Sequence, residues 1–182
     1  MNGTNRYPDI DNSSSGDTRN FGAGRGIIVG TLIHTTSGTS SLDWLLSGSA
    51  RAGRPASADF LIDRDGTRHK LTRPGYYPYH AGESRYDIYG RKYRGNDLSS
   101  ILLGVELENR DDQRCTYQQL DSLAELLVIV GLDNSWRWPY YLLGHYEVAR
   151  PLGRRSDPQG FDWGDFMGRL YATALAAQVP GL

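Results

Sequence analysis

The chain has 182 residues, of which 38% are hydrophobic, and 20 Lys and Arg against 21 Asp and Glu give a net charge of −1. This length predicts one domain with a core of its own, and the balanced charge excludes the broad positive field that drives nucleic-acid binding. The single cysteine, Cys115, excludes an internal disulfide and a multi-thiolate metal site, and no segment reaches the ~18 apolar residues that a membrane span needs.

The N-terminal stretch MNGTNRYPDIDNSSSGDTRN is rich in Asn, Ser, Gly and Asp and has no apolar signal-peptide segment. We therefore expect a protein made in the cytoplasm without a signal peptide. We also expect a loosely held arm over residues 1–22 and the folded domain over residues 23–182.

Apolar runs of different periodicity predict the first elements of the domain. Residues 26–34 (GIIVGTLIH) are apolar and β-branched, which predicts a buried strand that ends at His34. Residues 42–50 fit a short helix, and residues 58–71 fit a β-hairpin with an Asp-Gly turn. Residues 72–97 contain prolines and glycines throughout and predict a long loop, which in a compact domain is often functional.

The clearest strand is followed by the clearest helix. Residues 100–109 (SILLGVELEN) alternate, and one face of this strand changes from apolar to acidic at Glu106 and Glu108. Residues 116–132 combine a capping-box pattern with a core-facing leucine stripe, which predicts a structural helix.

The last two elements again place a strand before a helix. Residues 140–145 (YYLLGH) predict a strand that ends at His145, and residues 162–177 predict a helix with Asp162 at its N-cap. Strands that alternate with helices indicate a single domain of the α/β class.

Two histidines and one aspartate form a candidate metal site. His34 and His145 each stand at the end of a predicted strand, where side chains emerge into a crevice, and Asp157 adds a carboxylate. Two imidazoles and one carboxylate are a ligand set of catalytic Zn²⁺, which leaves a fourth position for water. Zinc lowers the pKa of such a water to ~7 and polarises a carbonyl oxygen, so the set predicts hydrolysis of an amide or ester.

Such a site also needs a group that takes and returns a proton and a cation for the oxyanion. Glu106 is the first choice for the proton, and Glu108 on the same face is the alternative. Arg155 or Arg154, just before the aspartate, can supply the positive charge.

The remaining histidines and the cysteine have weaker roles. His80, in the motif YHAG, is expected either to contact the substrate or to support a metal ligand, and His69 is expected at the surface. Cys115 lies in the approach to a predicted helix, so we expect it to be structural or incidental and not a nucleophile.

From about residue 27 to 177 the chain resembles the zinc-dependent N-acetylmuramoyl-L-alanine amidases of the peptidoglycan-recognition fold. That group includes phage endolysins and the amidases that recycle anhydro-muramyl peptides. The motifs that carry the resemblance occur in the family's order: LIHTTSG, ADFLIDRDG, YHAG, NDLSSILLGVELEN and GHYEVARPLGRRSDPQGFDW.

The resemblance implies a mixed central sheet flanked by helices and a function. The implied reaction is cleavage of the amide between N-acetylmuramic acid and L-alanine in peptidoglycan, with Zn²⁺ as the cofactor. The balanced charge and the lack of a long apolar segment add the expectation that the protein neither binds nucleic acid nor inserts into a membrane, and we expect a monomer. The resemblance implies that the zinc ligands are His34, His145 and Asp157. It further implies that Glu106 is the catalytic carboxylate and Arg155 the basic residue, and that His80 and Asn96 contact the substrate.

Several functional readings remain open at this point. The first is an endolysin-like enzyme that lyses the cell wall after a holin-type release, and the second is a cytoplasmic amidase acting on soluble anhydro-muropeptides. A peptidoglycan-binding module without catalysis is a third reading, but all three ligands are present. A serine or cysteine hydrolase is a fourth and lacks a nucleophile beside a base.

Overall fold

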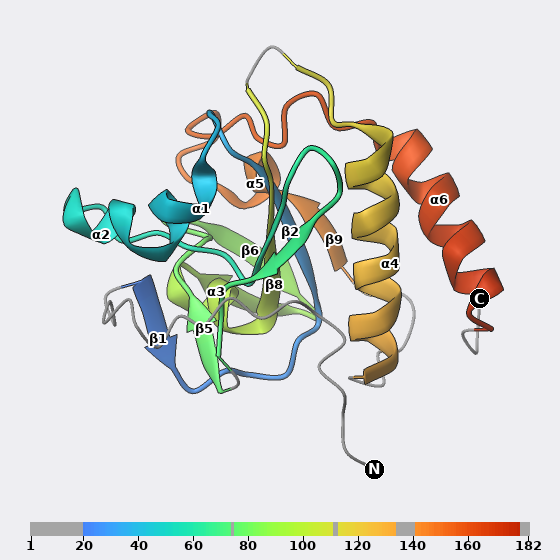
Figure 1. Cartoon of the computed structure of the whole chain (residues 1–182). Helices are drawn as coiled ribbons and strands as arrows, with labels where there is room; N and C mark the ends of the chain where they lie inside the picture. The colour runs from blue at the N-terminus through green and yellow to red at the C-terminus, as the bar shows by residue number, and fades with distance from the viewer. Residues whose placement is uncertain (1–19, 74, 111–112, 134–140, 179–182) are drawn as a thin grey trace.

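The computed structural model describes residues 20–73, 75–110, 113–133 and 141–178 as an α/β domain (Figure 1). Its elements are β1 (Phe21–Ala23), β2 (Gly30–Thr35), α1 (Ser41–Asp43), a π-helix (Trp44–Gly48), α2 (Ser49–Arg51), β3 (Phe60–Ile62), β4 (Arg68–Lys70), β5 (Tyr76–Pro78), β6 (Arg85–Ile88), β7 (Arg91–Arg94), α3 (Asn96–Ile101), β8 (Leu102–Leu107), α4 (Tyr117–Asp133), β9 (Tyr141–Gly144), α5 (His145–Val148) and α6 (Trp163–Ala176).

Among the described residues the main sheet has five strands in the order β4-β3-β8-β2-β9. Strands β3, β8, β2 and β9 are parallel to their neighbours, and β4 pairs with β3 in the antiparallel direction at the edge. The sheet is therefore mixed, and the predicted α/β class with a mixed central sheet is confirmed. The carboxyl ends of the four parallel strands lie at one edge, where ligands bind in open α/β sheets.

Helices cover both faces of the sheet. Helices α4 and α6 lie side by side against one face (Figure 1), where buried leucines of α4 pack on Ile33, Val105 and Leu107. On the other face, Leu32 and Leu102 pack against α3 and α5, and α1 covers a smaller cluster nearby.

Strand alternation assigns each side chain of β2 to one of these layers. Leu32 belongs to the cluster on the α3 side and Ile33 to the cluster under α4, so His34 returns to the α3 side. In β8, Val105 packs under α4, and Glu106 therefore points to the same side as His34. Both faces of the sheet therefore carry apolar clusters, and on the α3 side the strand ends also carry the polar groups His34 and Glu106.

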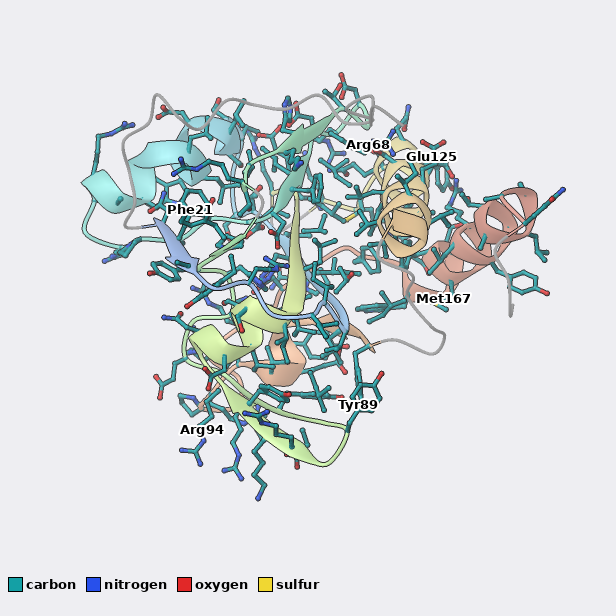
Figure 2. The ribbon with its side chains drawn as sticks, turned by 90° about the horizontal axis from the view of Figure 1, so that it is seen from below. Phe21, Arg68, Tyr89, Arg94, Glu125 and Met167 are labelled. Atoms are coloured by element: carbon teal, nitrogen blue, oxygen red, sulfur yellow. The ribbon has the colours of Figure 1, made fainter. Side chains whose placement is uncertain are left out.

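The long helices begin where the sequence predicts. Thr116 Oγ1 accepts the Gln119 N–H at 3.1 Å and Gln119 Oε1 accepts the Thr116 N–H at 3.0 Å, which completes the capping box of α4. Asp162 caps α6 by accepting the Asp165 N–H. Figure 2 shows Arg68 of β4 beside Glu125 of α4, and their 3.3 Å ion pair ties the sheet edge to this helix.

The expectation of a loop over residues 72–97 was wrong in its middle. Strand β5 pairs with β1, strands β6 and β7 form a hairpin, and α3 begins at Asn96. The hairpin turn consists of Tyr89 and Gly90, both at positive φ, which is the backbone that a two-residue turn requires. The signal for a hairpin was one tyrosine on each side of this Tyr-Gly pair, Tyr86 and Tyr93, which face each other across the two strands. Tyr89 and Arg94 project from it at the end of the molecule away from α4 and α6 (Figure 2).

The boundary expected after residue 22 lies inside β1. Asn20 is buried and its side-chain amide donates to the carbonyls of Leu45 and Leu46, both at 3.2 Å. These bonds hold the chain from residue 20 onward against the helical segment that begins with α1. Residues 1–19 of the expected arm lie outside the described residues. In the described part of the chain, no helix has the length and apolar character to cross a membrane.

Candidate metal centre

Two histidines and one aspartate from separate segments meet at the edge of the main sheet. His34 stands one residue before the end of β2, and His145 directly follows β9 as the first residue of α5. Because β2 and β9 are parallel neighbours, both rings emerge at the same edge. Asp157 reaches them from the segment between α5 and α6.

Three ligand atoms converge on one point. His34 Nδ1 and His145 Nδ1 are 3.0 Å apart, and Asp157 Oδ2 lies 3.2 Å from the first and 3.0 Å from the second. Zinc holds nitrogen and oxygen ligands at ~2.0–2.1 Å in a tetrahedron, which puts neighbouring ligand atoms about 3.3 Å apart. The spacing of the three atoms fits such an ion.

The second nitrogen of each imidazole is also occupied. His145 Nε2 lies 3.2 Å from the Ala81 carbonyl oxygen, which can only accept, so the proton of a neutral His145 is on Nε2. His34 Nε2 faces His80 Nδ1 at 3.3 Å. With Nε2–H on both rings, two nitrogen lone pairs and a carboxylate oxygen face one another. A cation between them satisfies all three, so the donor set itself fits a metal.

Burial and mutual contact shift the pKa values of this group. Burial, together with the neighbouring His145, lowers the pKa of His34 to about 4, which favours the neutral ring that a metal requires. Burial acts to raise the pKa of Asp157, but its close contact with the two imidazoles outweighs burial, and the pKa is lowered. Burial also lowers the pKa of His80 well below its ordinary value.

Glu106 lies beside this group. It is the Cα partner of His34 in the ladder of β2 and β8, and its Oε2 is buried with no hydrogen-bond partner among the described residues. Burial and then the charge of Asp157 raise the pKa of Glu106 to about 8, while Arg155 opposes the shift. A carboxyl group with a pKa near neutrality can both accept and donate a proton.

The two neighbouring candidates have other contacts. Glu108 Oε1 accepts the Ser41 N–H at 3.1 Å, so this carboxylate supports the start of α1. Arg154 donates from Nε to the Arg150 carbonyl at 2.8 Å and from Nη2 to the Glu83 carbonyl at 2.6 Å. Arg154 therefore ties its loop to the segment before β6.

Arg155 differs from Arg154 in its surroundings. The side chain is exposed and, within the described part of the chain, makes no recorded hydrogen bond or ion pair. Its charge nevertheless lowers the pKa of both His34 and Glu106, which places it within electrostatic reach of the two groups.

The other predicted site residues lie in different surroundings. His80 is buried against the centre, with 7% of its surface exposed, whereas Asn96 is exposed at the first turn of α3. His69 Nε2 contacts Asp63 Oδ2 at 2.6 Å on the β3–β4 hairpin, away from the three ligands. Burial raises the pKa of the Cys115 thiol to about 11, so this cysteine is a poor nucleophile at neutral pH.

Sequence reasoning missed the groups behind the ligands. The Ala81 carbonyl and the Ser99 hydroxyl are not distinguished by residue type, because any residue carries a carbonyl and serine is common in loops and helices. Gly104 is a clearer case, because a Cβ there would lie 2.6 Å from Cγ of His80. A glycine inside a strand is a signal for the close approach of another group.

Solved structures resemble this domain at low sequence identity. The selenomethionine derivative of AmpD matches with a TM-score of 0.70 and 22% identity, over 92% of this chain and 96% of that one. The amidase AmiD from E. coli, in complex with anhydro-N-acetylmuramic acid-L-Ala-D-γ-Glu-L-Lys, matches with a TM-score of 0.61 and 22% identity, over 79% and 57% of the two chains. The endolysin LysCS from Clostridium intestinale URNW matches with a TM-score of 0.59 and 15% identity, over 82% and 88%. These likenesses establish the fold.

Sequence comparison establishes the family. No curated protein sequence matches the chain. The model of the N-acetylmuramoyl-L-alanine amidase family (Amidase_2), however, matches residues 25–160, which include the three converging side chains and Glu106. The chain therefore belongs to the Amidase_2 family of N-acetylmuramoyl-L-alanine amidases.

Proposed function

We propose that this protein is a zinc-dependent amidase that cleaves the bond between N-acetylmuramic acid and L-alanine in peptidoglycan. The observation that carries the proposal is the convergence of His34 Nδ1, His145 Nδ1 and Asp157 Oδ2 within 3.0–3.2 Å. These three residues would hold the ion. When bound, zinc supplies Lewis acidity for a carbonyl oxygen and for water. The family match supports the choice of the amide.

Glu106 is the proton-transfer group of the proposed reaction. It takes a proton from the water that attacks the lactyl carbonyl carbon and returns a proton to the L-alanine nitrogen as the C–N bond breaks. Its buried position and its pKa of about 8 support this double use, because one carboxyl group must exist in both forms during a cycle. The contact of Glu108 with Ser41 supports Glu106 over Glu108.

Arg155 stabilises the negative charge that develops on the carbonyl oxygen. A fixed cation near that oxygen lowers the barrier, because the charge is larger in the transition state than in the substrate. Its guanidinium is exposed and has no partner among the described residues, which supports this role. Arg154, by contrast, donates hydrogen bonds to two backbone carbonyls. Asn96, at the exposed start of α3, is proposed to contact the glycan or the stem peptide.

Intact cell wall is the substrate that we propose, in an endolysin-like role. The similarity of this fold to that of the Clostridium endolysin supports the endolysin-like role. The likeness to AmiD, whose complex holds an anhydro-muropeptide, supports the alternative of a soluble substrate.

Three measurements test the proposal. Metal analysis of the purified protein should find about one zinc per chain, and mass spectrometry should detect free stem peptides that begin with L-alanine after incubation with defined muropeptides. Faster loss of turbidity of whole peptidoglycan than turnover of soluble anhydro-muropeptides would support wall lysis, and the reverse would favour recycling. A zinc-loaded protein that releases no L-alanine peptide from either substrate would contradict the amidase function.

A further inference from the structure

His80 lies directly behind one of the metal-binding histidines. Its ring contacts the ring of His34 edge to face, with centroids 5.4 Å apart, and 7% of the residue surface is exposed. The ring also packs closely on β8, because a Cβ at Gly104 would lie 2.6 Å from Cγ of His80. A side chain in this place reaches a metal ligand more readily than a substrate.

The backbone holds His80 in this place. The amides of His80 and Ala81 both donate to the Ser99 hydroxyl, at 3.4 and 3.1 Å, and Ser99 is fully buried in α3. The same two residues face both metal-binding imidazoles, since His80 Nδ1 meets His34 and the Ala81 carbonyl meets His145. The segment His80–Ala81, which is hydrogen-bonded to α3, therefore contacts the Nε2 atoms of both His34 and His145.

Hydrogen-bond directions determine where the protons of these rings lie. His80 Nε2 is 3.2 Å from the Leu102 carbonyl oxygen, which only accepts, so a neutral His80 carries its proton on Nε2. His80 Nδ1 then has a free lone pair and accepts from His34 Nε2–H at 3.3 Å. With its proton on Nε2, His34 leaves Nδ1 bare and directed toward Asp157. The Leu102 carbonyl thus sets the tautomer of His34 through His80.

We propose that His80 is a positioning residue that orients His34 and fixes its tautomer for metal binding, and does not contact the substrate. The inference rests on the proposed zinc site. Residues that accept the second N–H of a metal-binding histidine typically contribute 10- to 100-fold to metal affinity. For His34 the acceptor of this N–H is the imidazole of His80, whereas for His145 it is the backbone carbonyl of Ala81.

Two substitutions separate the two nitrogens of His80. The amide oxygen of asparagine can replace Nδ1, and the amide nitrogen of glutamine can replace Nε2. His80→Asn keeps the acceptor for His34 and loses the donor to Leu102, whose carbonyl still accepts from Arg25 at 3.0 Å. His80→Gln keeps the donor and loses the acceptor. The variant His69→Gln removes an imidazole remote from the centre and is the matched control.

Zinc affinity, measured by chelator competition on the full chain, is the main readout. We expect a 10- to 100-fold loss for His80→Gln, a change of less than about 3-fold for His80→Asn, and no change for His69→Gln. KM of the zinc-saturated variants for a muropeptide should stay within about 3-fold of wild type. Equal zinc affinity in the two His80 variants, or a raised KM in both without a loss of zinc, would overturn the inference.

A measurement on the wild-type protein keeps the test independent of how the variants fold. Long-range proton–nitrogen NMR spectra should show the Nε2–H tautomer for His80, with or without zinc, and for His34 in the zinc-loaded protein. A proton on His80 Nδ1 would overturn the inference. Failure of the proposed function has a different signature, because zinc would bind with the expected tautomers while no muropeptide is cleaved.

Discussion

His34 and Glu106 are Cα partners in the parallel ladder of β2 and β8, and this pairing brings an imidazole of the candidate metal site and a buried carboxyl group together on one face of the sheet. The strand ends, and not a flexible loop, hold both side chains. Because neighbouring strands share one twist and one spacing, the separation of the two groups is set by the sheet itself. Rigid elements position reacting groups better than loops do.

Glu106→Gln should abolish most turnover and leave the metal bound. The amide has nearly the same shape but cannot take up the proton of the attacking water, so we expect a loss of about 10²- to 10⁴-fold in kcat. Zinc content by metal analysis and the rate on a defined muropeptide measure the two effects. Glu108→Gln is the matched control and should keep activity within about 3-fold of wild type. Equal losses in both variants would argue against a specific role for Glu106.

The stability of the metal-free protein should depend on pH through Glu106. The folded pKa of about 8 lies above the ordinary value of 4.5, so the stability that this group contributes is fully present below pH 4.5 and is lost as the pH rises through 8. Glu106→Gln removes this dependence. We compare the free energy of urea unfolding of the variant with that of wild type, with a chelator present. Between pH 4.5 and pH 8.5 this difference should shift in favour of the variant by on the order of 5 kcal/mol. A difference that does not vary with pH would show that Glu106 titrates normally.

Removal of one metal ligand should remove the ion. In His145→Ala, two ligands remain, and we expect less than about one tenth of a zinc per chain together with loss of amidase activity. Chelation of the wild-type protein should abolish activity, and added zinc should restore it. The variant His69→Ala should retain both zinc and activity, since His69 faces Asp63 on the β3–β4 hairpin. Full activity in His145→Ala would contradict the ligand assignment.

Substitution of Arg155 should affect catalysis, whereas substitution of the adjacent Arg154 should affect stability. Arg155→Gln removes a cation near the site without breaking a recorded contact among the described residues, so kcat should fall by about 10²-fold while the unfolding midpoint stays the same. Arg154→Gln breaks bonds to the carbonyls of Arg150 and Glu83 and should lower the free energy of unfolding by about 1–3 kcal/mol. Steady-state kinetics and urea unfolding of both variants test this division. The reverse pattern would exchange the two roles.

Cys115→Ser should leave amidase activity nearly unchanged. The thiol packs beside the core under α4, its pKa is raised to about 11, and its recorded contact is the Asn109 amide at 3.8 Å. Thiol-specific reagents should likewise not inhibit the enzyme. Abolished turnover in Cys115→Ser, with the fold intact by circular dichroism, would favour a cysteine hydrolase.

The sequence by itself determined the elements whose signals are local. The capping box of α4, the Asp162 cap of α6 and the apolar run of β2 depend on neighbouring residues, and each was predicted close to its place. The candidate ligand set could also be predicted, because few residue types bind zinc and both histidines stand at strand ends, and the structure brings these side chains together.

Only the tertiary structure decided how groups distant in the chain are used. Glu106 and Glu108 look equivalent along a strand, but β8 ends at Leu107 and the second carboxylate turns to Ser41. Arg154 and Arg155 look equivalent in a loop, and the contact with Glu83 distinguishes them. The hairpin of β6 and β7 and the position of His80 depend in the same way on contacts across the fold. Such contacts join segments with no fixed sequence separation, so the local periodicity of the sequence does not predict them.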